Sequence, residues 1–238
     1  MVNIAVIISL SALGLIALTY VVYPVWQLIF PGKPVDFTGE FTPPSVSVVF
    51  AAYNESAIIE AKIRSIYRTN YPIGLLSVWI GSDLSSDGTD DIIRNLQSEF
   101  PQLNLHVNDR RSGKSATINL LVEQTTAEVI IATDANILFK ETTIEELVRP
   151  IALQKATAVA GTLVYEAGGV TNSTASTEKA YLSLENTIRR AESRKHGICF
   201  GMEGGLYSMK KSFWKPIPPN TFMEDFFQTV QLIARDQK

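Results

Sequence analysis

Short runs of β-branched residues alternate with stretches of helical periodicity from residue 46 to residue 163, and this pattern constrains the fold most. The run at 46–51 is apolar on both faces, which is typical of a strand buried inside a parallel sheet. The stretch after it places Ile59, Ile63 and Ile66 at helical spacing. We therefore predict an α/β fold, with a mostly parallel sheet flanked by helices. The expected strands cover 46–51, 76–81, 103–107, 128–133 and 158–163, and the expected helices cover 55–67, 89–100, 115–124, 143–153 and 176–195.

The N-terminal segment is apolar enough to be a transmembrane helix. Residues 4–23 contain only hydroxyl groups as polar side-chain groups, and at about 1.5 Å per residue they can cross a hydrocarbon core of roughly 30 Å. Tyr20, Tyr23 and Trp26 are typical of a membrane–water interface. A cleaved signal peptide would begin with basic residues and have a shorter apolar run. A buried core helix is the remaining alternative.

We expect three parts along the chain: a transmembrane anchor with its interfacial exit at 1–30, a linker at 31–44, and a catalytic domain at 45–238. The first charged residue, Lys33, follows the apolar segment, and the positive-inside rule then favours a cytoplasmic catalytic domain. The sequence thus predicts a cell-membrane protein that spans the lipid bilayer once within this chain.

Composition excludes several classes of function. Lys and Arg number 21 against 24 Asp and Glu, and this net charge of -3 argues against a nucleic-acid partner. One cysteine, Cys199, excludes an internal disulfide and a site built from several cysteines.

The polar residues gather where the expected strands end. In open parallel sheets, ligands bind beyond the carboxyl ends of the strands. Those ends are residues 52–55, Asp83, residues 108–114 and residues 134–136. We therefore expect the site to lie at this edge of the sheet.

Asp134 and Asn136 follow the expected strand at 128–133 directly. Strand alternation would point both side chains the same way, and two oxygen donors suit a hard cation that also binds phosphate. A turn or a helix cap is the alternative, because Asp and Asn favour both.

Asp83 precedes a loop, where its carboxylate could accept hydrogen bonds from a ribose hydroxyl or a base N–H. Asp87 and Thr89 are expected to cap the next helix instead. The segment 110–115 offers Arg110, Arg111 and Lys114 near a helix N-terminus, a combination that favours a diphosphate. A solvated basic loop is the alternative.

The Gly-Lys-Ser at 113–115 resembles the end of a P-loop. That motif needs a glycine where this chain has Asn108, so we exclude a nucleotide-triphosphatase.

Glu224 and Asp225 lie among Phe222, Phe226 and Phe227. Carboxylates in apolar surroundings have raised proton affinity, which a general base needs. A helix N-terminal acidic pair that complements the helix dipole explains the same residues.

Six segments together resemble the inverting family 2 glycosyltransferases of the GT-A fold, which include cellulose, chitin and hyaluronan synthases. The segments occur in the family's order and span most of 45–230. They are VVFAAYNE at 48–55, SDLSSDGT at 82–89, GKSATIN at 113–119, TDAN at 133–136, GMEGGLYSMKK at 201–211 and MED at 223–225.

The resemblance implies a role for each matching position. Ala52, Tyr53, Glu55 and Asp83 would surround the base and ribose of a nucleotide sugar, Lys114 and Asp134 would approach the nucleotide or its phosphates, and Asp134 with Asn136 would bind Mg²⁺ or Mn²⁺. Asp225 would be the catalytic base, and Phe200, Gly201, Glu203, Gly204 and Glu224 would lie on the acceptor side. The family's second metal-binding Asp is Asn136 here, which puts metal affinity in question.

The implied reaction transfers a hexose from a nucleotide sugar, with UDP expected, to a hydroxyl of a polysaccharide or glycolipid acceptor at the cytoplasmic membrane face. One base and no second nucleophile predict inversion at the sugar. Processive members carry a Gln-x-x-Arg-Trp motif and further membrane helices, which this sequence lacks. We therefore expect a fragment, with a shorter non-processive type as the alternative.

Two other functions compete with this hypothesis. A membrane-tethered domain could bind a nucleotide sugar for regulation, without turnover, as Asn136 suggests. A sugar nucleotidyltransferase would need a glycine-rich loop where this chain has residues 51–54, and we rank it last.

Overall fold

The computed structural model describes residues 4–164, 173–198, 201–202, 205–219 and 221–235. The chain divides into two units, one made of Met1–Asp36 with Val164–Phe200 and the other of Phe37–Leu163 with Gly201–Lys238. The second unit holds the sheet and the residues of the candidate site.

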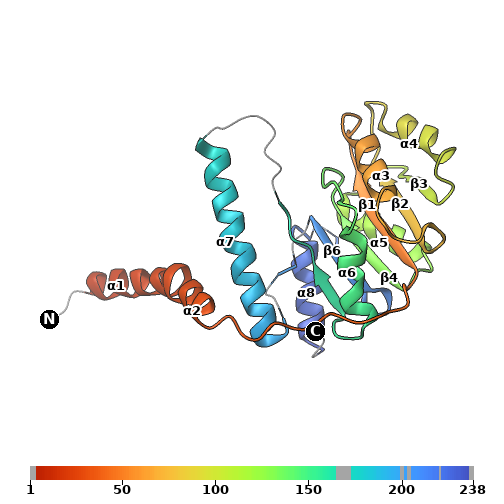
Figure 1. The fold of residues 1–238 in the computed structure, drawn as a ribbon. Coiled ribbons are helices and arrows are strands. Elements are labelled where there is room, and N and C mark those ends of the chain that lie inside the picture. The colour runs from red at the N-terminus through yellow and green to blue at the C-terminus, as the bar shows by residue number, and fades with distance from the viewer. Residues whose placement is uncertain (1–3, 165–172, 199–200, 203–204, 220, 236–238) are drawn as a thin grey trace. The chain divides into compact units, whose positions relative to one another are not determined.

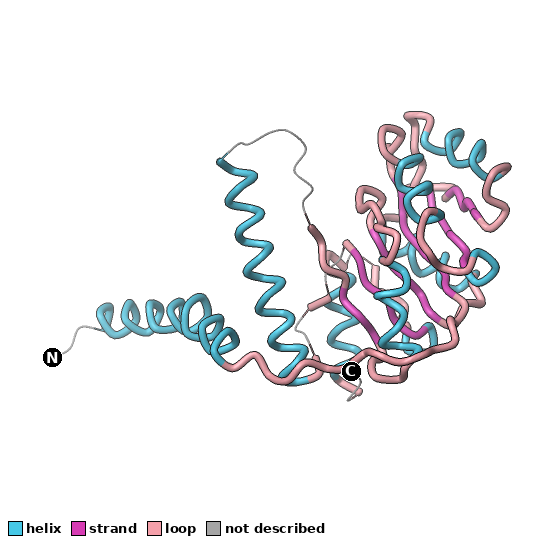
Figure 2. Tube along the Cα trace, in the orientation of Figure 1, coloured by secondary structure: helices cyan, strands magenta, loops and turns pink. Residues whose placement is uncertain are grey.

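Six strands form one sheet in the order β3-β2-β1-β4-β6-β5 (Figures 1 and 2). Neighbouring strands among β1 to β4 pair in parallel, and β6 is antiparallel to both β4 and β5. The predicted α/β fold with a mostly parallel sheet is confirmed. The strands are β1 (Val46–Ala52), β2 (Leu76–Ser82), β3 (Leu103–Val107), β4 (Val129–Thr133), β5 (Ala158–Ala160) and β6 (Leu206–Lys210).

Helices cover both faces of the sheet because side chains alternate between the faces along each strand. Val48 and Phe50 share one core with α3 (Ile59–Tyr67), α4 (Thr89–Gln97) and α6 (Thr143–Ala152). Val49, between them, shares the other core with α5 (Lys114–Gln124) and α8 (Glu224–Ile233). Short 3-10 turns at Ile73–Leu75 and Lys211–Phe213 complete this unit.

The strand expected at 158–163 covers only Ala158–Ala160, the helix expected at 89–100 ends at Gln97, and two further elements differ from the expectation. The helix expected from residue 55 begins at Ile59, because the Glu55 carbonyl accepts hydrogen bonds from the N–H groups of Ile58 and Ile59 in a preceding turn. The strand β6 was not expected at all, since it is short and follows a glycine-rich segment.

The other unit begins with a helical segment of 26 residues, Ile4–Ile29, with a mean hydropathy of 2.4. Of the residues that the structure describes, this is the one segment long and apolar enough to span a membrane. It comprises α1 (Ile4–Ala17), a π-helical turn (Leu18–Val22) and α2 (Tyr23–Ile29). Pro24 has no N–H to donate to the preceding turn, and the wider π turn accommodates this loss. The last helix of this unit is α7 (Ser173–His196).

Candidate active site

Lys114 is the first residue of α5, and its ammonium group contacts two carboxylates from distant parts of the sequence. Its Nζ lies 2.7 Å from Oδ1 of Asp134, which follows β4, and it also forms an ion pair with Glu224 at the start of α8. The Glu224 side chain is 8% exposed, and a carboxylate this buried would be costly without the ion pair to Lys114. Burial lowers the pKa of Lys114, but Asp134 and Glu224 together outweigh burial and raise it, which keeps the ammonium charged.

Asp134 and Asn136 lie in a turn at the end of β4. The Asp134 N–H donates to the Gly205 carbonyl at 3.1 Å, and the Asp134 carbonyl accepts from the N–H of Ile137 at 3.3 Å. Because the strand ends at Thr133, its two-residue alternation does not extend to Asn136, which is exposed while Asp134 is half-buried. The two side chains share a turn rather than a strand face.

The donors in this turn fit a hard divalent cation. Asp134 offers a carboxylate and Asn136 an amide oxygen, the kinds of ligand that Mg²⁺ uses together with substrate phosphate. Within the described part of the chain, no group of three or more His, Cys, Asp or Glu side chains is placed to hold a metal ion. A cation here would therefore take much of its coordination from the substrate.

A buried lysine lies beneath the same turn. Lys62 of α3 is fully buried, and its ammonium donates to Thr133 Oγ1 at 3.0 Å and to the Ile137 carbonyl. It lies 4.2 Å from the centroid of the Phe139 ring. Burial lowers the pKa of Lys62 well below its ordinary value, and the nearby Asp134 carboxylate opposes this change. Lys62 thus fixes both ends of the turn that carries Asp134.

Tyr207 is a fully buried residue of β6, the strand that pairs with β4. Its hydroxyl is buried and finds no hydrogen-bond partner among the described residues. Burial raises the pKa of Tyr207 well above its ordinary value, and the charges of Glu224, Asp225 and Asp134 raise it further. The hydroxyl therefore stays protonated and remains a hydrogen-bond donor.

Glu224 and Asp225 are the first two residues of α8. Two of the phenylalanines that flank these carboxylates in sequence are exposed, Phe222 by 98% and Phe226 by 45%, and they do not surround both carboxylates. The helix turns Glu224 inward to Lys114 and leaves Asp225 half-buried, while these two phenyl rings project outward. Burial of the carboxylates thus applies to Glu224 alone.

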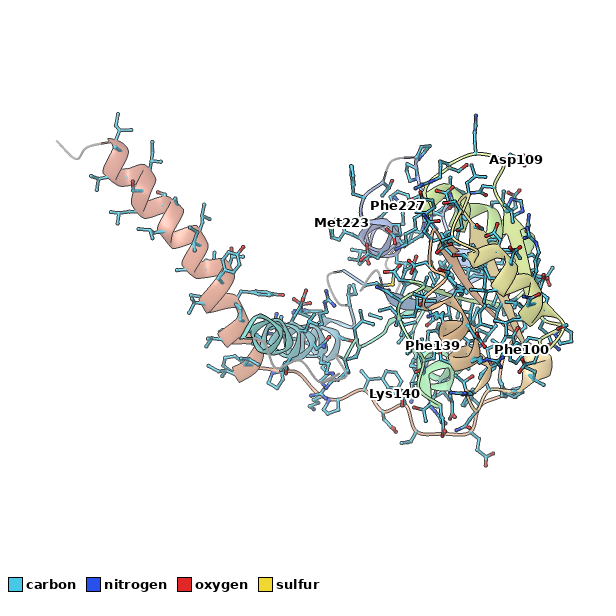
Figure 3. All side chains as sticks on the ribbon, turned by 90° about the horizontal axis from the view of Figure 1, so that it is seen from above. Phe100, Asp109, Phe139, Lys140, Met223 and Phe227 are labelled. Carbon is cyan, nitrogen blue, oxygen red and sulfur yellow. The ribbon has the colours of Figure 1, made fainter. Side chains whose placement is uncertain are left out.

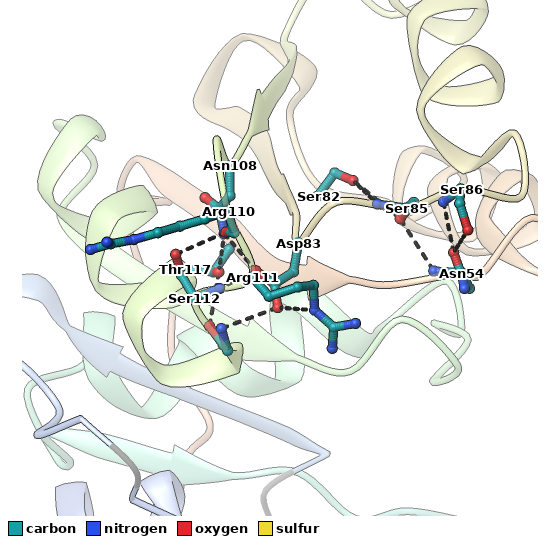
Figure 4. A network of polar contacts seen from close by, with 11 residues as sticks. Asn54, Ser82, Asp83, Ser85, Ser86, Asn108, Arg110, Arg111, Ser112 and Thr117 are labelled. Atoms are coloured by element: carbon teal, nitrogen blue, oxygen red, sulfur yellow. Dashed lines mark hydrogen bonds and ion pairs between the residues drawn. The ribbon is translucent and has the colours of Figure 1, made fainter.

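Asp83 is saturated by hydrogen bonds from the loop before α5 (Figure 4). Its Oδ1 accepts from Asn108 Nδ2 at 3.0 Å and from the Ser112 N–H at 2.7 Å. Its Oδ2 accepts from the Gly113 N–H and from Arg111 Nε, both at 3.1 Å. Burial raises the pKa of Asp83, but these four hydrogen bonds outweigh it and hold the pKa below its ordinary value. Because Gly113 precedes Lys114, this network adjoins the Lys114 cluster.

Ala52 ends β1, and Tyr53 and Glu55 follow it beside this network. The buried Ala52 accepts a hydrogen bond from the Asp83 N–H through its carbonyl at 2.9 Å. The exposed Tyr53 ring lies 3.5 Å from the guanidinium carbon of Arg111. The Glu55 N–H donates to Thr89 Oγ1 at 2.9 Å, which ties the turn to α4.

The remaining expected site residues are less informative. Gly201 adopts a left-handed backbone with φ of 92° next to Met202, whose N–H donates to Thr229 of α8. Phe200, Glu203 and Gly204 lie outside the described residues. Asp87 accepts a hydrogen bond from the Thr89 N–H, but Gly88 occupies the N-cap of α4 and Thr89 is the first helical residue, so the expected capping by both residues is found only in part.

Sequence reasoning missed Lys62 and Tyr207. The helical spacing of Ile59, Ile63 and Ile66 would have found Lys62, because a lysine at position 62 lies on the same buried face. Tyr207 gave no such signal, since β6 itself was not recognised.

Comparison with known proteins identifies the family. Residues 47–215 match the sequence model of Glycosyl transferase family 2, which is about seven tenths of the chain. This chain belongs to glycosyl transferase family 2. The predicted family is thereby confirmed, and the ordered motifs identified it correctly.

Curated relatives match over a shorter stretch. The beta-monoglucosyldiacylglycerol synthase of Trichormus variabilis is 36% identical over 95 residues, which is 39% of this chain and 20% of that protein. The glycosyltransferase AglE of Haloferax volcanii is 27% identical over 95 residues, which is 40% of this chain and 31% of that protein. These matches thus span less than a third of either relative's length.

Solved structures confirm the GT-A fold. The mannosyltransferase PcManGT from Pyrobaculum calidifontis, solved with GDP-Man and Mn²⁺, superposes with a TM-score of 0.78 at 23% identity, over 95% of this chain and 64% of that one. S. aureus TarS 1–349 superposes with a TM-score of 0.61 at 16% identity, over 79% of this chain and 54% of that one.

Proposed function

We propose that this family 2 chain is the anchor and catalytic part of an inverting glycosyltransferase. It transfers a sugar from a UDP-sugar to a hydroxyl of a polysaccharide or glycolipid at the cytoplasmic face of the cell membrane. The contact of Lys114 with Asp134 and Glu224 carries the proposal. That contact joins a phosphate-binding cation, a metal-binding carboxylate and the neighbour of the catalytic base at the carboxyl edge of the sheet.

The nucleoside binds beside Asp83. The four hydrogen bonds of its carboxylate use its full acceptor capacity, so a base N–H or a ribose hydroxyl must displace one donor. Arg111 is the donor that yields, because its side chain is 54% exposed, whereas the other donors are the buried Asn108 side chain and two backbone N–H groups. Ala52, Tyr53 and Glu55 line the same turn, and the exposed Tyr53 ring is free to stack on the base once Arg111 moves.

The diphosphate binds between Lys114 and the turn of Asp134 and Asn136. Lys114 begins α5, where free backbone N–H groups and the helix dipole favour negative charge. A Mg²⁺ or Mn²⁺ ion held by Asp134 and Asn136 would neutralise charge on the leaving phosphate. Lys62 holds this turn in place from below through Thr133 and Ile137.

Asp225 is the catalytic base. It is half-buried and directly follows Glu224, and its charge raises the pKa of Tyr207. It takes the proton of the acceptor hydroxyl as that oxygen attacks the anomeric carbon, opposite the leaving diphosphate. General base catalysis contributes roughly 10²–10⁴-fold. One displacement inverts the anomeric centre. Phe200, Gly201, Glu203, Gly204 and Glu224 are assigned to the acceptor side.

The membrane-anchor assignment rests on Ile4–Ile29, whose apolar side chains are exposed along the whole helix (Figure 3). A cytoplasmic catalytic domain follows from Lys33 on its C-terminal side. The relative named beta-monoglucosyldiacylglycerol synthase supports a glycolipid acceptor.

A donor screen tests the proposal. The detergent-purified chain is mixed with UDP-, GDP- and dTDP-sugars and with Mg²⁺ or Mn²⁺. Nucleotide release is measured, and NMR gives the anomeric configuration of the product. We expect release from a UDP-sugar that requires the cation, and inverted product. Tight UDP binding without transfer to any acceptor would favour the tethered binding domain, and no binding of any nucleotide would overturn both functions.

A further inference from the structure

We propose that the C-terminal half of α7, residues 182–196, binds the phosphate groups of anionic lipids at the membrane surface. The proposal rests on the membrane anchoring proposed above for Ile4–Ile29. It involves none of the residues assigned to sugar transfer.

This half of α7 packs closely on α2, the C-terminal part of the membrane helix. The Tyr23 hydroxyl hydrogen bonds to the buried carboxylate of Glu192, and the Lys195 ammonium lies 4.9 Å from the centroid of the Trp26 ring. A Cβ atom at Gly32 would come within 2.7 Å of the Lys195 backbone nitrogen, so the chain leaving α2 runs directly against α7. Gln27 is buried in the same contact. The helix α2 and the C-terminal end of α7 therefore pack against each other, and we call this contact the joint.

The joint lies at the level of the lipid headgroups. Tyr23 and Trp26 are the aromatic residues that favour a membrane–water interface. Within this unit α7 runs across the axis of α1, and it is seen end-on in Figure 3 where α1 is seen from the side. If α1 crosses the bilayer, α7 lies along the membrane surface. Leu184, which is exposed and lies on the same helix face as Ala191, then faces the lipid.

The two acidic side chains described in this segment, Glu185 and Glu192, are engaged by Arg189 and Tyr23. Arg189 pairs with Glu185 at 2.8 Å, and Glu192 is bonded to Tyr23. Arg190 and Arg194 are exposed one helical turn apart, and no ion pair to either is found in the described part of the chain. Arginine binds phosphate through two parallel hydrogen bonds, and its long stem lets the charge reach the headgroups. These two arginines, with Lys195 beside them, fit anionic lipid phosphates.

The same arrangement strengthens the predicted orientation. In sequence, Lys33 alone follows the apolar segment closely. In the structure, Arg190, Arg194 and Lys195 join it at the same end of the membrane helix, although they lie far away along the chain. An excess of basic residues at this end favours the cytoplasmic leaflet, where anionic lipids are found.

Native mass spectrometry of the full chain released from detergent micelles tests the site. Bound phosphatidylglycerol is compared with phosphatidylcholine for the wild type, for Arg190→Gln/Arg194→Gln, and for the matched control Arg68→Gln/Arg94→Gln, whose arginines are exposed in the other unit. Each basic group near an anionic surface strengthens binding about fivefold. We expect the wild type and control to prefer phosphatidylglycerol, and the variant to lose about 25-fold in affinity for it.

Three results would overturn the site: no preference in the wild type, an unchanged preference in the variant, or equal competition by soluble glycerol 3-phosphate. Circular dichroism and UDP binding of the variant show that it is folded. Nucleotide release measured in detergent distinguishes the two proposals, since it can fail while the lipid preference remains.

Discussion

Lys114 contacts Asp134 and Glu224 and is assigned to the diphosphate. Its charge should therefore affect the affinity for UDP more than the affinity for uridine. Lys114→Met keeps the length of the side chain and removes the ammonium that contacts Asp134 and Glu224. We expect UDP binding to weaken about tenfold, the effect of losing a charge-assisted hydrogen bond of about 1.5 kcal/mol. Uridine binding should change little. Titration calorimetry in detergent with both ligands measures this.

Lys210→Met is the matched control, because Lys210 pairs with Val129 at the opposite end of β4. It should leave both affinities unchanged. An equal loss of UDP and uridine affinity in Lys114→Met would contradict a diphosphate role. That result would point instead to local unfolding around the buried Glu224.

Asp83 should make stability depend on pH. Its pKa lies below the ordinary value of 3.8, since four hydrogen bonds outweigh burial. A group with a lowered folded-state pKa stabilises the fold above its ordinary pKa, and the stabilisation is lost as pH falls through the folded-state value. Asp83→Asn should therefore lower Tm most above about pH 5 and progressively less below pH 3.8.

Thermal unfolding of the purified chain followed from pH 3 to pH 7 measures this difference. Asp91→Asn is the control, because the Asp91 side chain is 80% exposed. A Tm difference for Asp83→Asn that stays constant across the whole range would refute the assignment.

Part of the site could be predicted from single residues. Asp83, Lys114 and Asp134 lie in segments that follow expected strands, and the edge rule for parallel sheets placed them together. Lys62 and Tyr207 could not be placed by that rule, because they approach the site from the core rather than from the strand ends. The Lys114–Glu224 ion pair needs α8, whose position depends on packing distant in sequence.

At the scale of elements, the packing of α5 on β2 positions Lys114. A Cβ atom at Gly81 of β2 would lie 2.1 Å from Cγ2 of Thr117 in α5. We expect Gly81→Ala to displace α5 and to cost about 1–3 kcal/mol of unfolding free energy. UDP affinity should fall with it, because Lys114 begins that helix.

Thr117→Ser provides the rescue. It removes the clashing methyl group and keeps the hydroxyl that bonds Asn108 and the Gly113 carbonyl. Thermal unfolding and UDP titration of both single variants and the double variant form a complete cycle. If Gly81→Ala alone is neutral, or if Thr117→Ser does not rescue it, the close approach does not position α5.

Elements with strong local signals were predicted, and the one without such a signal was not. β1 to β4 are apolar runs followed by helices, so their parallel pairing was expected and is found. β6 follows a long helix and a glycine-rich segment, and it enters the sheet antiparallel between β4 and β5. The position and direction of β6 in the sheet depend on tertiary packing, and its five residues alone do not indicate either.

At the scale of the whole molecule, membrane topology can be measured directly. With Cys199→Ser as background, we expect a cysteine at the exposed Ser98 to react with a membrane-impermeant maleimide only after the cells are opened. A cysteine at Asn3 should react in intact cells, because residues 4–29 would separate the two positions. Labelling of Ser98→Cys in intact cells would reverse the proposed orientation.

The central claim is that Asp225 acts as a base beside a nucleotide diphosphate held by Lys114 and Asp134. Asp225→Asn preserves the shape of the side chain and removes its capacity to accept a proton. We predict that it binds UDP with unchanged affinity in calorimetry and loses at least 100-fold in sugar transfer. Transfer at the wild-type rate by Asp225→Asn, with UDP binding intact, would contradict the account.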